Sequence, residues 1–201
     1  MKTPLLFEMN GRRALVVGLG RVGRRRARTL ADAGCTVTAL IKAPPADWNS
    51  TGVKVVQKAF EAADLASVDL VVAATDDAET NAAVLAACRL RGIPVNVADD
   101  PDASDFFFPA VIRRGDLTLS VCTEGASPMT TKAIVKELKA AYGEDYARRL
   151  TALKTLRAAI IARADDPAEK RRRLKELTVL PTSKLAELAA SQNQSEQSEE
   201  A

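Results

Sequence analysis

The stretch Ala14-Leu15-Val16-Val17-Gly18-Leu19-Gly20-Arg21-Val22-Gly23 decides the fold of this 201-residue chain. It begins with four apolar residues, which is typical of a strand buried on both faces. It then runs through a G-x-G-x-x-G motif into a segment of helical periodicity, in which Gly18 permits a tight turn, Gly20 lets a pyrophosphate approach the backbone and Gly23 lets the helix pack on the strand. Free N–H groups at a helix start bind phosphate. The stretch therefore predicts a dinucleotide site.

Short apolar runs and helical segments alternate through the first part of the chain. Residues 36–41, 53–56, 70–74 and 94–97 are expected to be strands, whereas residues 21–33 and the segment from Asp76 or Asp77 to Arg91 are expected to be helices. This alternation favours a parallel sheet with right-handed crossovers. The fold class is therefore α/β, with an N-terminal sheet of the Rossmann type.

The pattern changes in the second half of the chain. Residues 106–112 and 117–121 are expected to form two strands joined by a turn at Arg114-Gly115, followed by a helix over 129–142. Three charged helical segments follow, over 146–163, 167–177 and 183–190. We expect a Rossmann domain over 1–112, an α+β segment over 113–143, a helical domain over 144–190 and a disordered tail over 191–201, which is rich in Ser, Gln and Glu.

Composition excludes several classes of function. The 29 basic and 26 acidic residues are too balanced to indicate nucleic-acid binding, and no apolar run is long enough to cross a membrane. Histidine is absent, which rules out His-dependent triads and His-ligated zinc within the chain, so no metal site is predicted. The three cysteines form no C-x-x-C pair, and no secretory signal is visible, so a reducing cytoplasm is expected.

The residues alone leave the choice between NAD and NADP open. A carboxylate about 20 residues beyond the glycine motif usually binds the ribose of NAD. Here the second strand ends in Leu40-Ile41-Lys42-Ala43-Pro44, and Lys42 either attracts a 2′-phosphate or is a solvated lysine. Thr75, after the fourth strand, is a candidate contact for the nicotinamide, although it and the two aspartates that follow also suit helix capping.

A carboxylate follows the fifth expected strand, in Asn96-Val97-Ala98-Asp99-Asp100-Pro101. Ligands of open α/β sheets bind beyond the carboxyl ends of the strands, so these polar groups are expected near the nicotinamide. Asp99 is a candidate general base that takes a proton while a hydride leaves the substrate. The alternative is an ordinary turn, since Asp and Pro are common turn formers.

These motifs, taken together in their order and spacing, resemble a known family. They are Pro4-Leu5-Leu6-Phe7, residues 15–26 around the glycine loop, Ala73-Ala74-Thr75-Asp76-Asp77 with Asn81, Asn96-Val97-Ala98-Asp99, Phe108-Pro109-Ala110 and Glu124-Gly125-Ala126-Ser127-Pro128. The chain is similar to precorrin-2 dehydrogenase, the dehydrogenase and ferrochelatase module of siroheme synthase. The resemblance covers about residues 4–142.

The resemblance implies an enzyme, an NAD-dependent oxidoreductase of siroheme biosynthesis that converts precorrin-2 to sirohydrochlorin. It places the catalytic aspartate at Asp99, substrate contact at Asn96, and cofactor contacts on the glycine loop, particularly Arg21 and Val22, and on Lys42 and Ala43. It shifts the cofactor towards NAD. It also implies a homodimer in which segments 113–142 interlock. A second activity of the family is that of a lyase, in which ferrous iron is a substrate and is inserted to give siroheme, and the resemblance makes this activity a candidate here.

Precorrin-2 carries many carboxylates, so its site needs cations. Candidates are Arg113, Arg114, Lys132 and Lys136, each of which also suits a solvated face. The chain departs from the family where Glu124 replaces a glycine and Thr123 a serine, which leaves ferrochelatase activity open. A rival hypothesis is a non-enzymatic, dinucleotide-sensing regulatory module.

Overall fold

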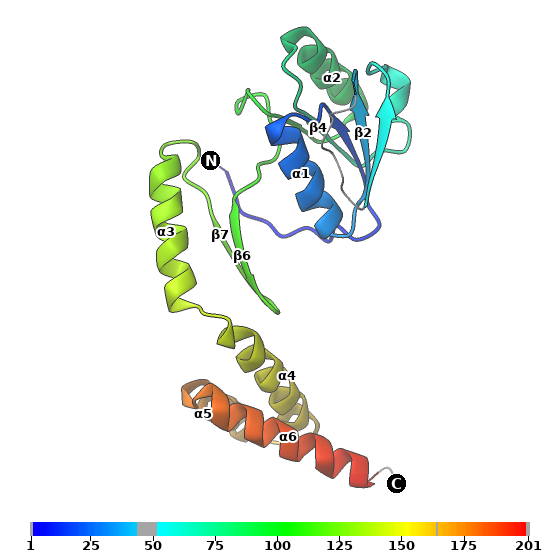
Figure 1. Cartoon of the computed structure of the whole chain (residues 1–201). Helices are drawn as coiled ribbons and strands as arrows, with labels where there is room; N and C mark the ends of the chain where they lie inside the picture. The colour runs from blue at the N-terminus through cyan, green and yellow to red at the C-terminus, as the bar shows by residue number, and fades with distance from the viewer. Residues whose placement is uncertain (1, 44–51, 164, 200–201) are drawn as a thin grey trace. The chain divides into compact units, whose positions relative to one another are not determined.

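A computed structural model describes residues 2–43, 52–163 and 165–199. The chain forms two compact units, Met1–Phe108 and Pro109–Ala201 (Figure 1). From the sequence we expect domain boundaries near residues 112 and 143. Each unit is described by itself below.

The first unit is built on a five-stranded parallel sheet of order β3-β2-β1-β4-β5. Its strands are β1 (Arg13–Val17), β2 (Thr36–Ile41), β3 (Val53–Gln57), β4 (Leu70–Ala73) and β5 (Val95–Val97). Four residues of β1 and all of β4 and β5 are buried, as expected for strands covered on both faces. The predicted parallel sheet is confirmed, and its strand order reverses between β1 and β4.

Helices cover both faces of this sheet. On one face α1 (Arg21–Asp32) packs Ala27 and Leu30 into a core with Val16 and Val72. On the other face, α2 (Ala78–Arg91) and the 3-10 turn η1 (Ala62–Leu65) pack against the strand side chains that point away from α1. Since both faces are covered, the carboxyl ends of the strands are the part of the sheet left to bind a ligand.

The segment before the second unit differs from its prediction. Residues 106–112 were expected to be one strand, but β6 begins only at Ala110. The Phe106 carbonyl accepts a 2.7 Å hydrogen bond from Asn96 Nδ2, and the Phe106 and Phe108 rings pack on the sheet core with centroids 5.7 Å apart. Packing on the sheet, rather than pairing with a strand, therefore fixes the first part of this segment.

The second unit joins a hairpin to four helices. The antiparallel strands β6 (Ala110–Arg114) and β7 (Leu117–Val121) meet at Gly115, whose φ of 57° suits a tight turn. The helix α3 (Pro128–Ala141) follows, capped by Ser127 Oγ, which accepts from Thr130 N at 3.1 Å. The remaining helices are α4 (Asp145–Arg163), α5 (Pro167–Val179) and α6 (Thr182–Glu199).

The three C-terminal helices share a small core. Its buried members are Ala152, Leu156, Leu177, Leu185 and Ala189. The guanidinium of Arg149 donates to the carbonyls of Thr178 and Leu180, each at 2.7 Å, and so satisfies acceptors at the end of α5. No helix within the described ranges is long and apolar enough to cross a bilayer.

The structure corrects the expectation of a disordered tail over 191–201. The helix α6 runs without interruption to Glu199, and residues 200–201 lie outside the described residues. Gln and Glu are good helix formers, so a helix anchored by Leu185 and Ala189 propagates through this polar segment.

Candidate active site

The glycine loop lies at the carboxyl end of β1, where the strand order reverses. Gly18 has a φ of 95°, and a Cβ there would lie 2.6 Å from the Ala74 carbonyl oxygen, so only glycine fits between β1 and the end of β4. A Cβ at Gly23 would lie 2.0 Å from Gly18 O. In contrast, no described atom lies within 4 Å of a Cβ built at Gly20. Two glycines therefore close the turn, and the third leaves open space over the start of α1, as a bound pyrophosphate needs.

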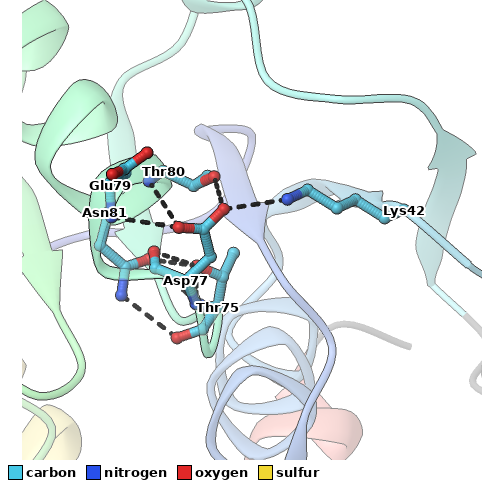
Figure 2. Close-up of polar contacts among 6 residues, drawn as sticks. All are labelled: Lys42, Thr75, Asp77, Glu79, Thr80 and Asn81. Carbon is cyan, nitrogen blue, oxygen red and sulfur yellow. Dashed lines mark hydrogen bonds and ion pairs between the residues drawn. The ribbon is translucent and has the colours of Figure 1, made fainter.

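The turn after β4 is organised around Asn81, a residue of α2 with only 3% of its surface exposed. Its Oδ1 accepts from Thr75 N at 3.2 Å and from Thr75 Oγ1 at 2.7 Å, while its Nδ2 donates to the Thr75 carbonyl at 3.2 Å (Figure 2). Nδ2 also lies 3.4 Å from Asp99 Oδ1, the acceptor after β5. Asn81 therefore joins the ends of β4 and β5.

Asp77 caps α2 and pairs with the cation that follows β2. Its Oδ1 accepts from the backbone N–H groups of Glu79 and Thr80, at 3.1 and 3.4 Å. Its Oδ2 accepts from Thr80 Oγ1 at 2.7 Å and from Lys42 Nζ at 2.9 Å (Figure 2). The Thr80 hydroxyl and then Lys42 hold the pKa of Asp77 below its usual range, and the hydrogen bond that Lys42 donates to Asp77 raises the pKa of Lys42. Asp77, one of the two predicted caps, is thus the N-cap of α2.

The Asp99 side chain is exposed beyond the end of β5. Ala98 N donates to Ala73 O at 2.9 Å, which holds the start of this loop against β4. Farther along, Ser104 Oγ accepts from Val97 N at 2.9 Å, and Asp105 Oδ2 accepts from Val95 N at 2.9 Å. The loop is therefore fastened to β5 on both sides of an accessible carboxylate.

Asn96, for which the resemblance implies contact with substrate, is buried at the end of the sheet. Its side chain is 2% exposed and its Nδ2 donates to Phe106 O, so it holds the loop onto the sheet. Its Oδ1 is buried without a hydrogen-bond partner among the described residues. A contact of Asn96 with substrate stays a prediction, and the bonds formed here serve the fold.

Arg26 brings positive charge to Asp99 from α1. Its guanidinium lies 5.4 Å from the centroid of the Phe108 ring, and within the described part of the chain its buried Nε and Nη1 have no hydrogen-bond partner. Burial and the neighbouring Arg25 lower the pKa of Arg26, whereas the charge of Asp99 acts in the opposite direction. The Asp99 carboxylate therefore lies in the field of a cation that the fold keeps close.

The remaining predicted residues lie in both units. Arg21 and Ala43 are exposed in the first unit and Val22 is half-buried. Arg113 on β6 and Lys132 on α3 are exposed in the second unit, so both are accessible to a carboxylate. Arg114 is engaged in the fold instead, in a 3.2 Å ion pair with Glu144.

The loop that departs from the family pattern stores backbone strain. Glu124, which the resemblance places at a glycine position of the family, has a φ of 51° in the left-handed region. A side chain in that region costs about 1 kcal/mol relative to glycine. The neighbouring Thr123 hydroxyl lies 2.9 Å from Thr131 Oγ1 of α3, so the residue in the family's serine position is part of a hydrogen-bond network.

Known proteins are similar to this chain in sequence and in fold. The chain is 40% identical over 135 residues to the siroheme synthase of Methylococcus capsulatus, a match that covers 65% of this chain and 28% of that protein. It is 38% identical over 151 residues to the siroheme synthase of Pseudomonas entomophila, covering 70% and 32%. The chain thus spans about a third of the length of these curated relatives. The solved structure of SirC, a precorrin-2 dehydrogenase, aligns with a TM-score of 0.70 and 26% identity over 94% of this chain and 100% of that one.

A parallel sheet with a glycine turn at its switch point defines an NAD(P)-binding protein of the Rossmann type. In agreement, residues 5–110 match the family model described as "Putative NAD(P)-binding". The chain belongs to the family that contains SirC and the N-terminal module of siroheme synthases.

Two residues of this site had no role assigned from the sequence. In the sequence, Asn81 stands out only as part of the family motif, and Arg26 only as one of several arginines of a helix. The signal for Asn81 was a polar residue on the apolar face of α2, beside the buried Val84 and Cys88. Arg26 had no such signal, because only the tertiary fold brings the Phe108 ring and the charge of Asp99 near it.

Proposed function

We propose that this chain is an NAD-dependent precorrin-2 dehydrogenase that forms sirohydrochlorin in siroheme biosynthesis. The single observation that carries the proposal is the accessible Asp99 carboxylate, which follows β5. The strand β5 is the neighbour of β4, and the glycine loop lies between β1 and β4, where the strand order reverses. Family membership supplies the substrate, since SirC is a precorrin-2 dehydrogenase and the curated relatives are siroheme synthases.

The reaction removes two hydrogens from the reduced macrocycle. When bound, NAD supplies the redox chemistry by accepting a hydride. The residues of the glycine loop, with Arg21 and Val22, bind the dinucleotide, and Thr75 and Ala43 lie at the strand ends that face it. The Asp99 carboxylate takes the proton that leaves with the hydride, which requires its charged form. The two hydrogens that leave the substrate are therefore accounted for, one as the hydride taken by NAD and one as the proton taken by Asp99.

NAD is the proposed cofactor rather than NADP. Lys42 stands where a ribose-binding carboxylate is common, but its charge is paired with Asp77 at 2.9 Å. A 2′-phosphate would have to displace Asp77 from Lys42 and remain beside a carboxylate. The ribose hydroxyls of NAD meet no such repulsion.

We assign contacts with the substrate carboxylates and the dimer interface to residues of the second unit. Arg113 and Lys132 are the proposed carboxylate contacts, because both are exposed. A two-stranded sheet is marginal by itself, and no residue of α3 is fully buried within the chain. Both features support a homodimer formed through β6, β7 and α3.

The test is an anaerobic assay of the purified chain with precorrin-2 and NAD, followed by the absorbance of sirohydrochlorin. We expect turnover, and we expect Asp99→Asn to lower it by about 10²–10⁴-fold while NAD binding persists. NAD binding without turnover would instead support a dinucleotide-sensing module. Added ferrous iron tests for siroheme formation in the same cuvette.

A further inference from the structure

The hydrogen bonds around Asn81 fix the orientation of its amide. Thr75 N–H can only donate, so the atom 3.2 Å from it must be the amide oxygen, Oδ1. The amide nitrogen then faces two acceptors, the Thr75 carbonyl at 3.2 Å and Asp99 Oδ1 at 3.4 Å. A flipped amide would set oxygen against oxygen on one side and N–H against N–H on the other. The two protons of Nδ2 thus have one acceptor each.

This arrangement is held by the fold around it. Asn81 is 3% exposed in the first turn of α2, between the ends of β4 and β5. The 3.4 Å separation of Nδ2 and Asp99 Oδ1 is long for a hydrogen bond. Since the hydrogen bonds with Thr75 fix the Asn81 amide, the Asp99 side chain is the group that can move to shorten this contact.

We propose that Asn81 is a positioning residue for Asp99: its amide binds Oδ1 of the carboxylate and leaves Oδ2 to take the proton from the substrate. The proposal deepens the proposed function and rests on it. Asn81 acts through Asp99 and need not touch the substrate. The guanidinium of Arg26 on α1 also acts electrostatically on Asp99, and Arg26 is unchanged in the variants below.

Asn81→Asp is the informative variant. It keeps an oxygen to accept from Thr75 N, but it replaces the N–H donor beside Asp99 with a second oxygen and adds a negative charge. We expect kcat to fall about 10- to 100-fold with the KM for NAD within about twofold, as for a base that is misplaced. The acid limb of the pH–rate profile should move to higher pH, because a neighbouring carboxylate favours the protonated base.

A double-variant comparison separates positioning from a structural role. In an Asp99→Ala background, Asn81→Asp should cause no further loss of the residual rate, because there is no carboxylate left to position. Glu79→Gln is the matched control, since it changes an exposed side chain in the same turn of α2 and should leave kcat near the wild-type value. Equal losses from Asn81→Asp in both backgrounds would overturn the proposal.

A measurement without turnover separates this proposal from the proposed function. In the full chain labelled with ¹⁵N at asparagine, the side-chain NH₂ signal of Asn81, assigned by its loss in Asn81→Asp, should shift with pH as Asp99 titrates. Asp99→Asn should abolish that shift. If the pH-dependent shift is the same in Asp99→Asn as in the wild type, the contact is refuted. If the wild-type chain fails to oxidise precorrin-2, the proposed function is wrong. The contact between Asn81 and Asp99 is then tested by this NMR signal alone.

Discussion

The Nζ atom of Lys42 lies 2.9 Å from Oδ2 of Asp77, so the cation that follows β2 is paired with the acid that caps α2. Both side chains are partly exposed, with 68% of Lys42 and 36% of Asp77 accessible, so the pair contributes little to folding. We propose that its consequence lies in the choice between NAD and NADP, because the pair offsets the charge of the lysine at the position where cofactors of this fold bind ribose.

Asp77→Asn should therefore widen cofactor use towards NADP. Asparagine still caps α2, but Lys42 gains a free charge and the repulsion of a 2′-phosphate is removed. We expect NADP affinity to rise about three- to tenfold with NAD affinity nearly unchanged, measured by titration calorimetry. Glu79→Gln, the same change of charge two residues away, is the control. Unchanged NADP affinity in Asp77→Asn would contradict the assigned role of the pair.

Two glycines of the loop should respond differently to alanine. Gly18→Ala forces a side chain into a φ of 95° and against Ala74 O, so we expect a loss of about 2 kcal/mol or more of unfolding free energy in urea. Gly20→Ala meets open space at a φ of −65°, so stability should change by less than about 1 kcal/mol while NAD affinity falls about tenfold or more. Equal NAD affinity in Gly20→Ala and wild type would show that the loop does not contact the cofactor.

The pH dependence of stability should involve Glu169 of α5. Hydrogen bonds from Arg172 and Arg173 lower the pKa of Glu169 from 4.5 to about 2. The folded carboxylate binds protons less tightly than the unfolded one, so its contribution is complete above about pH 4.5 and is lost as the pH falls to about 2. Glu169→Gln should therefore lower the urea midpoint at pH 6 and make no difference near pH 2.

Glu137→Gln, which makes the same change of net charge on α3, is the control for that comparison. A deficit of Glu169→Gln that is equally large at both pH values would show that lost packing, rather than the charge of Glu169, is responsible.

Thiol reactivity should distinguish Cys122 from the other cysteines. Cys122 is exposed, whereas Cys35 and Cys88 are buried. Burial raises the pKa of both buried thiols, that of Cys88 to about 11, which suppresses their thiolates at neutral pH. Iodoacetamide at pH 8 should modify Cys122 first, as read by peptide mass spectrometry, and unfolding should make all three reactive. Modification of Cys88 in the folded chain as fast as Cys122 would refute this burial.

Much of the fold was predictable from local patterns. The run Leu15-Val16-Val17 and the glycine spacing gave β1, its turn and α1, because a strand buried on both faces is apolar throughout and the turn needs glycine. The extent of α6 was missed, since composition reports polarity but not whether a helix is already anchored upstream by Leu185. The start of β6 was missed because Phe106 and Phe108 suit a strand as well as a core.

The sequence by itself determined the sheet, the glycine loop, the position of Asp99 after the fifth strand and the family resemblance, because each follows from apolar runs and motif spacing along the chain. Only the tertiary structure decided that Lys42 is paired with Asp77, that Asn96 is buried, and that Asn81 joins Thr75 to Asp99. These contacts link residues 6 to 35 positions apart, and they exist because parallel strands bring their carboxyl ends to one edge of the sheet.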